Sequence, residues 1–188
     1  MREQRGAVVV EMAVILPVLI LLVFGMLEFG LAFKDKLSMA HAVNQATRNA
    51  TVLGTDPRSD HSVLQAFEAG LSGATSIDTV IWVDVFKAGG DGAPAIWDRY
   101  TPDASICGWN PCPDPDPTVF SGYGLPSDYP PCSRDTGLEG GIDTIGVRVQ
   151  YTHNWVTGVL GMSPQTWSET ARGRIEPDVF GDGGAGCP

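Results

Sequence analysis

The stretch that decides the fold runs from Gly6 to Phe33 and reads GAVVVEMAVILPVLILLVFGMLEFGLAF. Only Glu11 and Glu28 interrupt this apolar run. A helix needs ~20 apolar residues to cross a bilayer. We therefore expect residues 7–33 to form one transmembrane helix, preceded by a short leader, residues 1–6, that is basic on balance.

A cleaved secretory signal is the alternative reading of this segment. Such signals have a shorter apolar part, ~7–15 residues, and end at a small-x-small site. Ala40-His41-Ala42 fits that pattern, but it lies beyond the charged residues 34–36 and within a stretch that continues the helical pattern. We expect the anchor to be retained.

The helical pattern continues past the apolar run as a stalk, residues 34–54. Glycine and proline in Gly54-Thr55-Asp56-Pro57 supply a stop. A helix from Ala7 to about Leu53 would be ~70 Å long at 1.5 Å per residue. Because that exceeds a membrane, its far half must pack on the folded domain or on other subunits.

The remaining residues, 55–188, are long enough for one modest domain. From Asp56 onward there are 18 acidic and 7 basic residues, and the whole chain carries a formal charge of −10. Nucleic acid is therefore a poor partner, since phosphate binding needs a basic surface. The acidity is typical of a soluble domain outside the cell. The alternative is that the acidic residues bind a partner.

Four cysteines lie in this acidic part, and none lies in the apolar run. An even count in a region rich in glycine, proline and aspartate predicts two disulfides and an oxidising compartment, with three pairings possible. A zinc site is the rival reading, but no C-x-x-C pair is present. The cysteines are Cys107, Cys112, Cys132 and Cys187.

The acidic domain shows the pattern of one short helix and two or three strands. Val63, Leu64, Phe67 and Leu71 predict an amphipathic helix that Ser59 or Asp60 would cap. Alternation of apolar residues predicts strands at 77–86, 144–153 and 165–175. Antiparallel strands covered by the long helix give an α+β fold.

Between the first two predicted strands, residues 88–141 are rich in cysteine, proline and glycine. Stretches of this length without regular structure are usually functional or disordered, and we expect an irregular insertion tied down by disulfide. Its aspartates could bind calcium, but they suit turns equally well. Its aromatic residues would either contact a ligand or pack the insertion: Trp97, Tyr100, Trp109 and Tyr123.

No catalytic constellation is evident. His41, His61 and His153 have no ligand-spaced neighbours, and the chain contains no nucleophile elbow, phosphate loop or dinucleotide fingerprint. We expect a protein that is not an enzyme, with no cofactor, no bound metal and no evident small-molecule substrate.

Several motifs together resemble the TadE-like family of the tight-adherence, type IV pilus-like apparatus. Gly6 precedes the apolar helix with Glu11 five positions later, as in prepilin peptidase sites. The resemblance covers about the first 54 residues, and residues 169–177 also resemble how such chains end. The other motif residues are Pro17, Glu28-Phe29-Gly30 and Arg48 within Ala46-Thr47-Arg48-Asn49-Ala50.

The resemblance implies a pilin-like fold, with the long helix packed on a small antiparallel sheet, and a structural role in an assembly. A prepilin peptidase would cut between Gly6 and Ala7, and Glu11 would then meet the new amino terminus of a neighbouring pilin-like subunit. Alternatively, Glu11 reaches the lipid headgroups. Pro17 should kink the helix, either as a functional joint or as an ordinary membrane proline.

The function expected from these features is that of a minor pilin or pseudopilin in a pilus assembly, secretion or adhesion system. The chain would cross the cell membrane once, contact membrane lipid and place its C-terminal domain outside the cytoplasm. A membrane-tethered binding module that uses the cysteine-rich insertion is the alternative.

Overall fold

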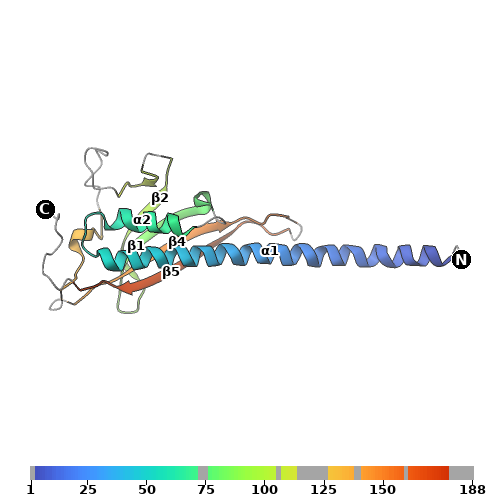
Figure 1. The fold of residues 1–188 in the computed structure, drawn as a ribbon, viewed down its shortest axis with the longest axis horizontal. Coiled ribbons are helices and arrows are strands. Elements are labelled where there is room, and N and C mark those ends of the chain that lie inside the picture. Colours follow the sequence, from blue (N-terminus) through green and yellow to red (C-terminus); the bar gives the residue numbers. More distant parts are fainter. Residues whose placement is uncertain are drawn as a thin grey trace.

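The structure is a computed structural model of the chain, and it describes residues 3–71, 76–104, 107–113, 127–137, 141–158 and 161–177, with only the backbone for residues 3–7. A long helix runs through the molecule, and the remaining elements gather around its C-terminal half (Figure 1). Its N-terminal half projects alone. This arrangement confirms the expected α+β architecture.

The long helix, α1 (Glu3–Leu53), comprises 51 residues, as the continuous apolar and stalk patterns predict. It begins within the predicted leader, so Gly6 and Ala7 are both helical. It ends where Gly54 adopts a φ of +47°, a conformation that glycine adopts without steric cost. Pro17 lies inside α1 without interrupting it, and the predicted kink is not visible in Figure 1.

Five antiparallel strands form one sheet in the order β3-β2-β1-β4-β5. The predicted strands correspond to β1 (Val80–Ala88), β4 (Thr144–His153) and β5 (Gln165–Arg174). The segment 88–141 holds the expected disulfide, between Cys107 and Cys112, and its irregular parts also enclose two strands that were not predicted, β2 (Pro94–Pro102) and β3 (Trp109–Asn110). Two short 3-10 helices, η1 (Ile77–Thr79) and η2 (Pro131–Ser133), complete the described elements.

The core lies between the sheet and the two helices. The stalk part of α1 packs against α2 (Ser59–Gly70) and against β4 and β5, and Figure 1 shows α2 lying alongside it. A Cβ on Gly70 would stand 2.6 Å from the Cα of Ala42, so this glycine allows the two helices to approach closely. The inward side chains of β4 are fully buried, as its alternation predicts: Ile145, Val147, Val149 and Tyr151.

The start of α2 differs from the prediction. Arg58 is the N-cap residue and makes no side-chain capping bond. Ser59 and Asp60, expected as caps, lie inside the first turn, where they are buried and accept hydrogen bonds from Arg134. Their side-chain oxygens therefore bind Arg134 and do not cap the helix.

A charged cluster occupies the opposite face of the sheet. Asp84 of β1 is fully buried and accepts hydrogen bonds from Arg99 at 2.7 and 3.0 Å and from Arg148 at 2.7 Å. Both guanidinium groups also lie over the ring of Trp82, at 4.0 and 5.1 Å from its centroid. Three strands are thus joined by one carboxylate.

Candidate functional site

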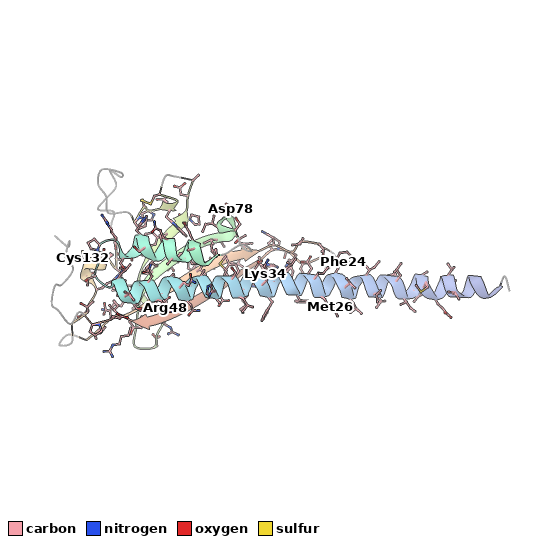
Figure 2. The ribbon with its side chains drawn as sticks, in the orientation of Figure 1. Phe24, Met26, Lys34, Arg48, Asp78 and Cys132 are labelled. Carbon is pink, nitrogen blue, oxygen red and sulfur yellow. A yellow bond between two sulfur atoms is a disulfide. The ribbon has the colours of Figure 1, made fainter. Side chains whose placement is uncertain are left out.

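The projecting part of α1 carries the residues predicted for processing and assembly. Its side chains are exposed from Val8 to Leu27, and Figure 2 shows Phe24 and Met26 on this part of the helix. By length and composition α1 could cross a membrane. Glu11 is exposed and has no hydrogen bond or ion pair with any residue that the structure describes.

Glu28, the second acid of the apolar run, has a different environment. Its side chain is only 1% exposed. Its carboxylate accepts hydrogen bonds from the amide of Val156 at 3.0 Å, from the amide of Thr157, and from the Thr157 hydroxyl at 2.5 Å. Such hydrogen bonds replace the water that a buried carboxylate loses.

The donors belong to the loop that joins β4 to β5. Gly158, directly after Thr157, has a φ of +61°, which lets the chain turn there with little steric cost. A second polar contact follows at the base of the loop, where Nδ1 of His153 lies 2.7 Å from Asp35. Glu28 and Asp35 are about two helical turns apart, so they share one face of α1.

Aromatic rings pack around these polar contacts. His153 stacks on Trp167 with ring centroids 4.9 Å apart and planes at 4°. Trp155 meets His153 edge-on at 4.8 Å and meets Phe29 edge-on at 6.2 Å. We call these contacts together the clasp. They join residues of α1 to residues of the hairpin that β4, β5 and their connecting loop form. The residues are Glu28, Phe29 and Asp35 of α1 and His153, Trp155, Val156, Thr157 and Trp167 of the hairpin.

The clasp accounts for part of the Glu28-Phe29-Gly30 motif. Glu28 and Phe29 both contact the loop. Gly30 is not explained by packing, since a Cβ there would meet nothing within 4 Å. Arg48 is exposed, and its guanidinium forms no ion pair with another described residue. Contacts among the described residues therefore explain Glu28 and Phe29 but leave Gly30 and Arg48 unexplained.

A buried polar cluster at the end of the domain away from the projecting helix was not predicted. Arg134 donates to Asp60 at 2.5 Å and to Ser59 at 3.0 Å, and Tyr100 donates to the other oxygen of Asp60 at 2.7 Å. Burial, reinforced by the charge of Asp60, raises the pKa of Tyr100 well above its usual value. The hydroxyl therefore stays protonated and remains a donor.

Asp98 and Asp143 extend this cluster towards residues 127–135. Asp98 accepts from Ser127 at 2.5 Å and from the amides of Asp128 and Tyr129, and Asp143 forms an ion pair with Lys87 at 2.6 Å. Burial raises the pKa of Asp98 despite these bonds. The cluster fixes an otherwise irregular segment to the sheet and is structural in character.

The histidines and other potential metal ligands of the described residues are spread over the fold. No group of three potential ligands is present there. His41 contacts Gln45, and His61 contacts Gln65, each one turn along its own helix. His153 is buried in the clasp. Each of the three histidines thus makes a contact within the fold.

The predicted disulfides and aromatic residues have mixed outcomes. Cys107 and Cys112 form a disulfide with their Cα atoms 5.7 Å apart, around β3. Cys132 is also disulfide-bonded, whereas Cys187 lies outside the described residues, as does Tyr123.

Tyr100 and Trp109 are 5% and 3% exposed and belong to the main core, so the idea that they form a binding surface is wrong. Trp97 is exposed.

Comparison with known proteins identified one family. Residues 6–48 match the family model described as TadE-like protein. This range contains Glu11, Pro17, the Glu28-Phe29-Gly30 motif and Arg48. No curated protein and no solved structure matched the chain.

Proposed function

We propose that this chain, which carries a TadE-like segment at residues 6–48, is a membrane-anchored minor pilin or pseudopilin-like component of a tight-adherence assembly. The TadE-like match indicates a structural component associated with such a pilus. The finer role follows from the helix that projects from the domain and from the acid near its tip.

The observation that carries this proposal is the environment of Glu11. It lies among exposed apolar side chains, and none of the described residues binds it. A carboxylate at that depth in a bilayer or helix bundle is costly unless it is paired. Glu28 obtains its partners from its own chain, so the contrast between the two acids favours a partner for Glu11 on another subunit.

The amino terminus of a neighbouring subunit is the partner that we propose. Cleavage between Gly6 and Ala7 by a prepilin peptidase would create a free amine close to the level of Glu11. Attraction between such charges strengthens at low dielectric but must offset the cost of desolvating both. The pair would therefore fix the register of subunits more than it would add stability.

The proposal assigns a role to each segment of the chain. Residues 1–6 would be the leader, residues 7–33 the single membrane pass, residues 34–54 the stalk and residues 55–188 the domain outside the cytoplasm. Lipid, other pilin-like subunits and the peptidase would be the partners. A ligand-binding insertion is less favoured, because Tyr100 and Trp109 are buried.

Native isolation tests the proposal. The tight-adherence apparatus should be purified from its own cells through a different, tagged component, and the retained chain analysed by intact mass. We expect the chain to copurify with a mass that begins at Ala7. A chain absent from the apparatus would overturn the proposed role, and a start at Val43 would overturn the retained anchor.

A further inference from the structure

The loop of the β4–β5 hairpin differs in composition from the rest of the domain. No charged residue occurs between Asn154 and Ser168, although 18 acidic and 7 basic residues are found from Asp56 onward. The described residues that follow β4, 154–158, lie alongside α1 at the side of the domain that faces its projecting half (Figure 1). The uncharged segment therefore lies next to the candidate membrane span.

The loop presents apolar surface beside exposed apolar residues of α1. The Val156 side chain is 71% exposed although its amide is bound to Glu28. Trp155 packs its ring against Phe29, which is itself 61% exposed, and Phe33 one turn further along is 64% exposed. Single exposed apolar residues are ordinary, but here they form a patch continuous with the span.

The depth of this patch follows from the geometry of α1. The stretch from Val8 to Leu27 is about 30 Å long at 1.5 Å per residue, which equals the hydrocarbon thickness of a typical bilayer. Glu28 then lies at the outer boundary of the hydrocarbon. Because the loop supplies the hydrogen bonds to Glu28, the loop must lie at the same depth.

Trp155 suits that depth. Tryptophan is enriched at membrane interfaces because its ring is apolar while its N–H needs a partner. Here the indole Nε1 donates to the carbonyl of Ser163 at 2.9 Å, within the same loop. Its polar atom is thus satisfied within the loop, and the half-buried ring, packed against His153 and Phe29, carries no unpaired polar atom towards the lipid.

We propose that this loop is a second membrane contact, with Val156 and Trp155 seated in the outer lipid interface beside α1. The inference rests on the proposed membrane span. The domain is then held to the bilayer at two points, the helix and the loop, and its tilt and its rotation about α1 are restricted. Departure of the chain from the membrane would expose the patch.

Spin labels in the full chain, reconstituted as single copies in phosphatidylcholine nanodiscs, test the proposal. One label is placed at Val156→Cys. Val52→Cys is the matched water-exposed control, since Val52 is also an exposed valine, 62% exposed, at the far end of α1. Ile20→Cys reports on the middle of the span. Accessibility is measured with oxygen, which concentrates in lipid, and with a water-soluble nickel complex.

We expect the ratio of oxygen to nickel accessibility at position 156 to lie at least threefold above that at position 52 and below that at position 20. Equal ratios at 156 and 52, with position 20 in lipid, would overturn the loop contact and leave the span intact. Nickel access at position 20 would instead overturn the span. Shielding of position 156 from both reagents in these single-copy discs would show that the chain itself covers the patch and would also overturn the proposal.

Discussion

The side chains of Glu28 and Thr157, 129 positions apart in the sequence, are joined by a hydrogen bond of 2.5 Å between the Thr157 hydroxyl and the carboxylate. This contact ties the domain to α1 at the place where the helix leaves it. An acid within the apolar run is therefore a structural element of this chain, because it joins the β4–β5 loop to α1.

Substitution Glu28→Ala should release the hairpin loop from α1. Three hydrogen bonds to a charged group are lost, which leaves the amides of Val156 and Thr157 and the Thr157 hydroxyl without their acceptor. We expect the amides of Val156 and Thr157 to exchange with deuterium at least tenfold faster in the full chain. Leu27→Ala, an exposed neighbour on the same helix, is the control. Unchanged exchange in Glu28→Ala would contradict the clasp.

The substitution Gly30→Ala distinguishes a role of Gly30 in folding from a role in assembly. A Cβ at position 30 meets nothing within 4 Å, and alanine is favoured over glycine in a helix by roughly 1 kcal/mol. The variant should therefore fold at least as stably as the parent in thermal unfolding, while incorporation into the apparatus falls if another subunit packs there. A lower melting temperature would show that Gly30 has an internal packing role after all.

Asp84→Ala should destabilise the domain. It leaves Arg99 and Arg148 facing each other without their shared carboxylate. Breaking a fully buried pair costs roughly 3–5 kcal/mol, and we expect about 2–3 kcal/mol here because both arginines reach solvent. Chemical unfolding of the detergent-solubilised chain measures this. Asp103→Ala, at an exposed position, should change stability by less than about 0.5 kcal/mol.

Asp98→Asn should become relatively more stable as pH rises. Burial raises the pKa of Asp98, so the folded state holds its proton more tightly than the unfolded state does. That contribution is fully present below the ordinary pKa of about 3.9 and is lost as pH rises through the raised value. The difference in unfolding free energy, variant minus parent, should increase between about pH 3.5 and 7. A pH-independent difference would contradict a raised pKa.

The long helix and the strands β1, β4 and β5 could be predicted because their patterns are simple. The apolar run and its continuation predict α1, and alternating Ile145, Val147, Val149 and Tyr151 predict β4 at the bounds observed. These segments bury one apolar face, so sequence periodicity reports their structure directly.

Other features depend on contacts between distant residues. The inward face of β2 carries Asp98 between Ile96 and Tyr100, so its alternation does not separate polar from apolar residues, and prolines bound the strand. Ser59 and Asp60 resemble capping residues, but Arg134, 74 positions from Asp60, determines their role. The partners of Glu28 could not be predicted either. The sequence feature that points to them is the uncharged stretch after His153.

The most direct test of the account is the behaviour of Glu11→Ala in cells that assemble the native apparatus. Membrane insertion, measured as resistance to alkaline extraction, should equal that of the parent, because the rest of the apolar run is unchanged. Incorporation into the purified apparatus should fall at least tenfold. Equal incorporation of the variant and the parent would contradict the claim that Glu11 binds the amino terminus of another subunit.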